Sequence, residues 1–165
     1  RSATSFHWVR SGVDLPAKFD LWNSENRVQQ SYQVIATTNT WNYTTATWRQ
    51  AQASANYQTD VMVGLAEDAF SMDLVVTSSN STGNVYRDVG CGYDSTTAFS
   101  GLTNGSASPT SNNDCPSFAK LINQPAIGIH YYAWLEYSVA TGTCSWHGDN
   151  GSTRVQSGMT GIWTC

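Results

Sequence analysis

Residues 126–165 read AIGIHYYAWLEYSVATGTCSWHGDNGSTRVQSGMTGIWTC and contain the longest alternating run in the chain. Apolar or aromatic residues recur at every second position from Ile127 to Val139. A period of two is typical of a β-strand, because successive side chains of a strand point to opposite faces. Gly142 can take the positive φ of a tight turn, so we expect residues 143–147 to return as the second strand of a hairpin.

Shorter alternating segments recur along the rest of the chain. They predict strands at residues 6–9, 18–22, 31–37, 57–65, 70–76 and 85–93, with 57–65 and 70–76 as a second hairpin. In the 85–93 segment, Gly90 and Gly92 share one face, which indicates close approach of a ring or of another backbone segment. The Gly-, Ser- and Asn-rich residues 95–116 indicate a surface excursion, and DCPSFAKLI at 114–122 predicts one helical turn capped by Asp114.

Roughly eight to ten short strands with frequent turn signals are typical of an all-β protein. We therefore predict an antiparallel β-sandwich of jelly-roll type with at most one short helical turn. The 165 residues correspond to one domain, which could be a fragment of a longer protein.

The charge pattern and the length of the apolar runs argue against binding to nucleic acid and against insertion into a membrane. Eight Lys and Arg residues stand against twelve Asp and Glu, and no basic cluster occurs, so we expect no nucleic-acid binding. The longest apolar run, Val61 to Ala66, is far shorter than the ~20 residues that span a bilayer, so we expect no membrane insertion.

Cys91, Cys115, Cys144 and Cys165 lie far apart and form no CxxC pair. This spacing argues against a zinc site, and we expect neither a metal nor a cofactor. The even count allows two disulfides in three connectivities, while cysteines inside strands can equally be small buried hydrophobes. Glycan acceptor triplets begin at four asparagines, namely Asn42, Asn80, Asn104 and Asn150.

Glu136 and His147 would lie opposite each other across the predicted final hairpin. A carboxylate that orients a histidine is an element of many catalytic sites. No motif places a Ser or Cys nucleophile beside them, so a polar cross-strand pair is the favoured interpretation. The other carboxylates show no paired arrangement, and Asp149–Asn150–Gly151 lacks the further ligands of a calcium loop. We therefore predict no catalytic residue.

Seven Trp and eight Tyr residues stand out in a chain with only 12% charged residues. Trp41 and Tyr43 fall in a polar, loop-like stretch, and exposed aromatic rings there could stack on a sugar. We take these two residues as the candidate ligand-binding site.

Several segments together resemble surface proteins of tailed-bacteriophage virions. They are WRQAQA at 48–53, VMVGLAEDA at 61–69, VGCGYDSTTA at 89–98, GIHYYAWLEYS at 128–138, SWHGDNG at 145–151 and QSGMTGIW at 156–163. The resemblance implies a domain of a tail fibre, a receptor-binding tip or a head decoration, with a jelly roll like that of complement C1q and tumour necrosis factor. It also implies a homotrimer and supplies no catalytic residues.

A trimer would explain why His130, Tyr132 and Trp134 lie opposite an already apolar strand face, and we expect these three residues at a subunit interface. The leading hypothesis is therefore a non-enzymatic protein of the virion surface that contacts other virion proteins and a host surface glycan or protein. Two alternatives are a carbohydrate-active enzyme and a secreted lectin on the same scaffold.

Overall fold

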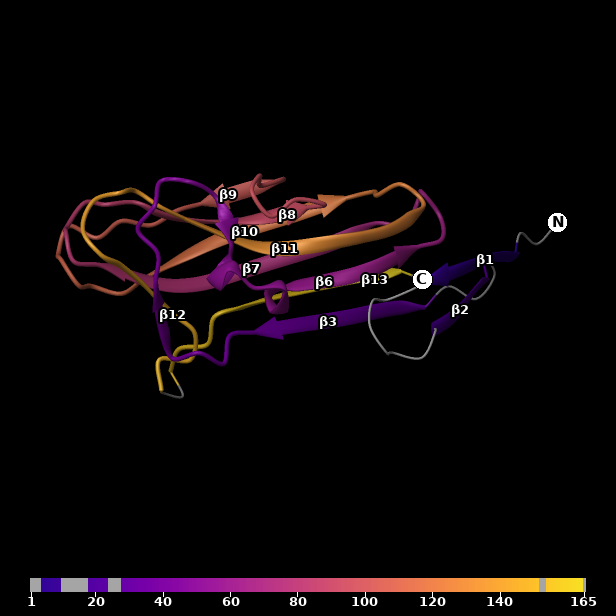
Figure 1. The fold of residues 1–165 in the computed structure, drawn as a ribbon, viewed down its shortest axis with the longest axis horizontal. Coiled ribbons are helices and arrows are strands. Elements are labelled where there is room, and N and C mark those ends of the chain that lie inside the picture. Colours follow the sequence, from indigo (N-terminus) through magenta and orange to yellow (C-terminus); the bar gives the residue numbers. More distant parts are fainter. Residues whose placement is uncertain (1–3, 10–17, 24–27, 152–153, 165) are drawn as a thin grey trace.

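The structure is a computed structural model that describes residues 4–9, 18–23, 28–151 and 154–164, the first two ranges by their backbone alone. The strands follow one another along the chain in this order (Figure 1): β1 (Thr4–Val9), β2 (Lys18–Asn23), β3 (Gln29–Ile35), β4 (Thr40–Asn42), β5 (Arg49–Gln50), β6 (Gln58–Val63), β7 (Phe70–Asn80), β8 (Arg87–Tyr93), β9 (Leu102–Asn104), β10 (Cys115–Asn123), β11 (Gly128–Ser138), β12 (Cys144–His147) and β13 (Gly158–Thr164). Two 3-10 turns, η1 (Ala51–Ala53) and η2 (Ala55–Tyr57), separate β5 from β6.

The prediction of an all-β antiparallel sandwich is confirmed. One sheet has seven strands, with β3, β13, β7, β10 and β9 side by side and with β12 and β4 continuing from the second half of β7. The other sheet has four strands, in which β11 pairs with β6 and β5 along one edge and with β8 along the other. β1 and β2, which match the two earliest predicted strands, pair only with each other among the described residues. No helix in the described part of the chain is long and apolar enough to cross a membrane.

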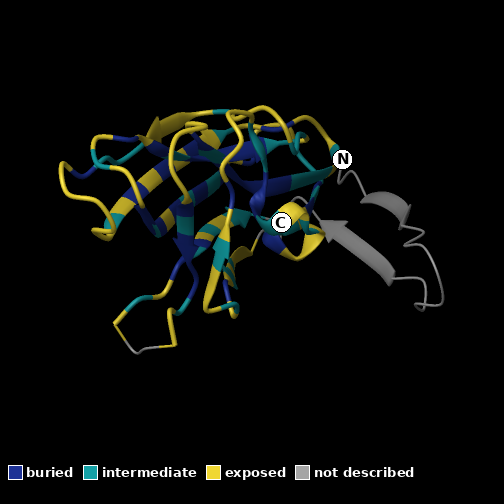
Figure 2. Cartoon of the chain, turned by 60° about the vertical axis from the view of Figure 1, so that its left-hand side comes forward, coloured by how far each residue is buried: buried dark blue, intermediate teal, exposed yellow. Residues whose placement is uncertain are grey.

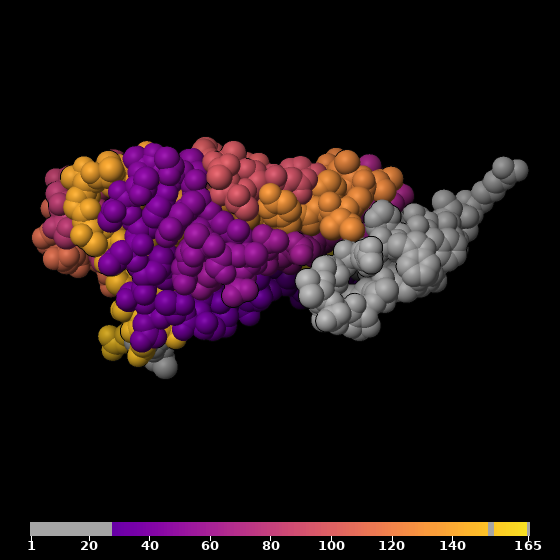
Figure 3. Space-filling model, viewed as in Figure 1, coloured from indigo at the N-terminus to yellow at the C-terminus, as the bar shows by residue number. Residues whose placement is uncertain are grey.

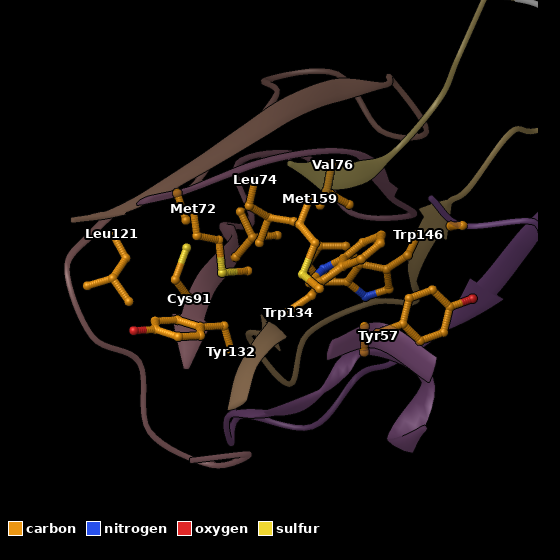
Figure 4. Close-up of a cluster of buried hydrophobic side chains, with 14 of the residues drawn as sticks. Tyr57, Met72, Leu74, Val76, Cys91, Leu121, Tyr132, Trp134, Trp146 and Met159 are labelled. Carbon is orange, nitrogen blue, oxygen red and sulfur yellow. The ribbon is translucent and has the colours of Figure 1, made fainter. Parts of the chain in front are cut away.

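The core lies between the two larger sheets. Alternate residues of β7 are buried there, and Phe70 stacks on Tyr132 of β11 with ring centroids 3.4 Å apart. Figure 4 shows Trp134 of β11 beside Trp146 of β12, so large rings from both sheets fill the same space. Figure 2 shows buried and exposed residues alternating along the strands, as the period of two requires.

Trp48 and Phe99 cover the middle of the outer face of the four-stranded sheet. Their rings lie 4.9 Å apart, and Leu135 of β11, on this outer face, is fully buried. A Cβ atom on Gly90 would lie 2.7 Å from the Cβ of Phe99, and one on Gly92 would collide with the Ser95 carbonyl. The predicted close approach at Gly90 and Gly92 is therefore confirmed, and it is what lets residues 95–99 lie flat on the sheet.

Both predicted hairpins are wrong in their connectivity, although their strands exist. β11 belongs to the four-stranded sheet and β12 to the seven-stranded one, so residues 139–143 cross between sheets. The same holds for β6 and β7. Periodicity reports which residues form a strand, but the choice of partner depends on contacts far away in sequence.

The helical turn predicted at 114–122 is also wrong, because residues 115–123 form β10. Their burial alternates strictly, with Ser117, Ala119 and Leu121 turned inward and the residues between them turned outward. Nine residues paired along their whole length with β7 outweigh the local helical signal of Asp114.

A pair of substitutions on neighbouring residues of β7 tests this assignment of faces. Leu74 is 1% exposed, so Leu74→Ala should lower the free energy of unfolding by about 2–5 kcal/mol. Val75 points outward and is 43% exposed, so Val75→Ala should cost less than about 1 kcal/mol. Chemical denaturation of both variants measures the difference, and equal losses would contradict the register.

Candidate functional site

Glu136 is the most heavily bonded carboxylate among the described residues, and it is completely buried. Its Oε2 accepts a hydrogen bond from the indole N–H of Trp41 at 2.6 Å. Its Oε1 lies 2.7 Å from both Nε and Nη2 of Arg49 and accepts from the backbone N–H of Gln52 at 3.2 Å. Because Trp41 belongs to the seven-stranded sheet and Glu136 to the four-stranded one, this cluster ties the two sheets together.

The segment that supplies these donors is itself firmly held. Gln52 has a φ of 54° and Ala53 one of 52°, in the left-handed region that such residues seldom occupy. The Gln52 side chain accepts from the Thr38 hydroxyl and donates to the Tyr57 hydroxyl, which fixes this conformation. In the space-filling view, this part of the chain, drawn in purple, lies across the front of the sandwich (Figure 3).

The environment of Glu136 is suited to holding structure. Burial raises the pKa of this carboxyl above its usual 4.5, while the hydrogen bonds from Trp41 and Arg49 and the charge of Arg49 limit the rise. Donors that belong to the protein itself occupy both oxygens, and the side chain has no exposed surface. The carboxylate therefore has no free face to offer a substrate.

The structure does not bring Glu136 and His147 together. Glu136 lies opposite Val89 of β8, and His147 lies opposite Thr77 of β7, in the other sheet. The predicted cross-strand pair is therefore wrong, because the two strands do not form a hairpin.

His147 instead lies beside Ser79 and Asp114, which invites comparison with a catalytic triad. A triad needs the serine on one ring nitrogen and the carboxylate on the other. Here Nε2 faces both groups, at 3.2 Å from the Ser79 hydroxyl and 3.0 Å from Asp114 Oδ1. Nδ1 is buried without a hydrogen-bond partner in the described part of the chain. This geometry cannot pass a proton from serine through the ring to the carboxylate.

His130 joins a second polar cluster at the start of β11. Its Nδ1 lies 2.7 Å from Asp94 Oδ2 and 3.1 Å from the Tyr93 hydroxyl, and its Nε2 lies 2.8 Å from the carbonyl oxygen of Ala126. Asp94 also accepts from the backbone N–H of Tyr131. These contacts fasten the loop after β8 to the loop before β11, and the imidazole is 12% exposed.

The expected subunit interface does not survive for two of its three residues. Tyr132 and Trp134 are fully buried in the protein's own core, and only His130 reaches the surface. The expectation placed these side chains on the outer face of β11, whereas the structure turns them inward. Their large rings fill the space between the sheets, while the smaller Ala133 and Leu135 fit beneath Trp48 and Phe99 on the outer side.

The candidate ligand-binding residues are also occupied. Trp41 packs against Tyr57 and Trp134, and its N–H bonds to Glu136. Tyr43 is 9% exposed, and the Arg49 guanidinium lies 3.8 Å from the centre of its ring. Trp41 is partly exposed, whereas Tyr43 is buried, so the structure does not present the two rings together as an exposed platform.

No group of three or more metal-ligating side chains gathers within residues 28–151 and 154–164. Asp149 accepts from the backbone N–H of Gly151 and so acts as a turn residue. Asn80 is 1% exposed, which closes one of the four glycan acceptor positions. Cys91, Cys115 and Cys144 are free thiols, and Cys165 lies outside the described residues.

The outer face of the seven-stranded sheet carries an apolar surface that the described residues leave uncovered. Six large apolar side chains on five adjacent strands are 42–72% exposed there: Ile35, Val75, Leu102, Phe118, Ile122 and Ile162. The cross-strand register arranges most of them in two rows, one through Ile35, Val75 and Phe118 and one through Ile162 and Ile122. Sequence reasoning missed this face, although the alternation at 118, 120 and 122 was a signal for it.

Between the two apolar rows runs a polar row that carries Asp73 and Lys120, and the Asp114–His147 pair lies on the same face beyond the row of Val75 and Phe118. Asp73 of β7 lies opposite Lys120 of β10, with 2.7 Å between Nζ and Oδ1. Both side chains are about half exposed. A shallow groove of about 450 Å³ lies over this part of the sheet and is lined by Val75, Leu102, Phe118, the ion pair and their neighbours.

Comparisons with known proteins add little. No protein-family model matches the chain, and no curated protein matches it. Among solved structures, one similar chain comes from "Structure of infectious bursal disease virus Gx strain", with 9% identity and a TM-score of 0.26. The match covers 97% of this chain and 45% of that one, so this chain spans less than half of that protein's length.

Removing the charge of Glu136 tests its role as the tie between the sheets. In Glu136→Gln, the amide nitrogen must face the donor of either Trp41 or Arg49, so one buried donor loses its acceptor. We expect the free energy of unfolding to fall by about 1–3 kcal/mol. Asp60→Asn, at an exposed position of β6, is the matched control and should change it by less than about 0.5 kcal/mol. Equal stability of the two variants in a denaturant titration would contradict the role.

The thiols should differ sharply in reactivity. Burial raises the pKa of both Cys91 and Cys144 to about 12, and neither side chain is exposed, whereas Cys115 is partly exposed. Since the thiolate is the reactive form, iodoacetamide at neutral pH should label Cys115 in the folded protein and spare the other two. Peptide mass spectrometry reads the sites, with urea-unfolded protein as the control in which all three react.

Proposed function

We propose that this chain is a non-enzymatic structural protein of a bacteriophage virion surface, which works by packing against other protein subunits. The observation that carries the proposal is the uncovered face of the seven-stranded sheet. Contiguous exposed apolar patches often mark protein contacts, and this face gathers six large apolar side chains. The segments that resemble phage surface proteins support the same assignment.

The contrast between the two outer sheet faces strengthens the proposal. Trp48 and Phe99 cover the four-stranded sheet from within the chain, and none of the segments whose side chains the structure describes lies over the apolar rows of the seven-stranded sheet. The polar clusters support a structural role too, since Glu136 is enclosed and His147 lacks triad geometry. The proposal includes self-association but gives no number of subunits. Two of the three residues that were expected at a trimer interface, Tyr132 and Trp134, lie in the core.

The proposal places the domain on the outside of the particle, as part of a tail fibre, a receptor-binding tip or a head decoration. In that position the loops between strands would face a host surface glycan or protein. The proposed role requires no catalytic activity of the domain. It requires a stable scaffold and at least one contact surface.

The decisive measurement is the presence of the protein in purified particles. Mass spectrometry of density-banded virions, produced from a genome that encodes the chain, should detect it in multiple copies, and immunogold labelling should place it on the surface. Absence from banded particles, with the protein present in the surrounding lysate, would overturn the proposal. Release of reducing sugar ends from polysaccharide by the purified protein would favour the enzymatic alternative instead.

A further inference from the structure

We infer that the outer face of the seven-stranded sheet binds the same face of a second copy of this chain, across a two-fold axis that runs parallel to the strands between β7 and β10. This inference rests on the proposed structural function and specifies the partner of the uncovered face. The inference is based on the arrangement of charged and apolar side chains on that face.

The charges between the two apolar rows are balanced, although the chain as a whole has a formal net charge of −4. Asp73 and Lys120 are neighbours in one cross-strand row, one on each of the two central strands. A partner with a strong charge of either sign would therefore meet one attractive and one repulsive group. A partner that carries one negative and one positive group in the opposite order would place each group against an opposite charge.

A second copy supplies that order under only one of the simple two-fold arrangements. Rotation about an axis parallel to the strands keeps every residue in its row and places β7 of one copy over β10 of the other. Asp73 then faces Lys120 of the partner subunit, and Lys120 faces the partner subunit's Asp73. Rotation about an axis along the row would instead place Asp73 against the partner's Asp73, and the like charges would repel.

The same rotation matches the apolar residues. Val75 and Phe118 occupy one row on the two central strands, so each would face the other residue of the partner subunit. Thr160 of β13 and Leu102 of β9 lie in the charged row at equal distances from the proposed axis, so they too would face each other. Two sheets that pack in this way lie about 10 Å apart with their strands nearly aligned. An interface of this kind is closed, because each copy uses the face once.

The size of the face predicts a weak contact. Five strands about 4.8 Å apart and five residues of about 3.4 Å each give a plane of roughly 400 Å². Stable protein complexes bury about 800 Å² on each partner. We therefore expect a dimer that forms at high micromolar concentration and dissociates on dilution.

Charge reversal tests the inference on the folded full chain. Sedimentation equilibrium should show the unmodified protein passing from monomer to dimer as its concentration rises. Asp73→Lys places four positive groups around the axis and should weaken the dimer about tenfold or more, and Lys120→Asp should do the same with negative groups. Because the ion pair is half exposed, both variants should keep their fold, which circular dichroism checks.

Mixing the two variants separates this geometry from other modes of association. One Asp73→Lys copy and one Lys120→Asp copy again place opposite charges across the axis, so the equimolar mixture should form a heterodimer. The double variant with both changes keeps the complementary pattern and should dimerise by itself. Asp60→Lys changes the net charge by the same amount on an exposed residue of β6, and should dimerise as the unmodified protein does.

Four results would overturn the inference. They are a monomer at every concentration, a trimer in place of a dimer, equal behaviour of Asp73→Lys and Asp60→Lys, and failure of the mixture to recover association. Each of these results leaves the virion test unaffected. Protein found in particles together with any of them would mean that another partner covers the face.

Discussion

Four donors converge on the buried carboxylate of Glu136, and the tie between the two sheets depends on them. A carboxylate without partners in such a place would be very costly, so the chain from Trp41 to Gln52 must lie where its donors reach the two oxygens. That requirement accounts for the left-handed conformation of Gln52 and for the cross-sheet bond of Trp41. One buried charge thus fixes the path of a segment that has little regular structure of its own.

The sequence predicted the strands far better than their partners. The alternating run from Ile127 to Val139 predicted β11, and the paired glycines of β8 predicted a close approach, which Phe99 makes. Both signals are local, since they depend on alternation along one strand or on the absence of a side chain. Which sheet β12 joins is decided by its register with β7, some 65 residues earlier, and no neighbouring residue carries that information.

The face of β11 that turns inward could not be read from alternation, because both of its faces are apolar in the centre. The volumes of the side chains determine which face turns inward. Tyr132 and Trp134 fill the wide space between the sheets, and Leu135 fits the thin layer under Trp48. The donors of Glu136 were equally hidden, since Trp41 and Arg49 lie 95 and 87 residues away from it. Glu136 therefore belongs to a structural cluster with Trp41 and Arg49, and not to the polar cross-strand pair with His147 that the sequence favoured.

The outer faces of the two sheets differ in how far the chain itself covers them. Rings from its own loops cover the four-stranded sheet, whereas the seven-stranded sheet keeps an exposed apolar face on both sides of the Asp73–Lys120 pair. The weak contact proposed for that face would suit an assembly in which many copies are held together. Fixed neighbours raise the effective concentration to about the millimolar range, so that a contact too weak for free solution becomes more than half formed. The same weakness would keep newly made chains apart until the rest of the assembly positions them.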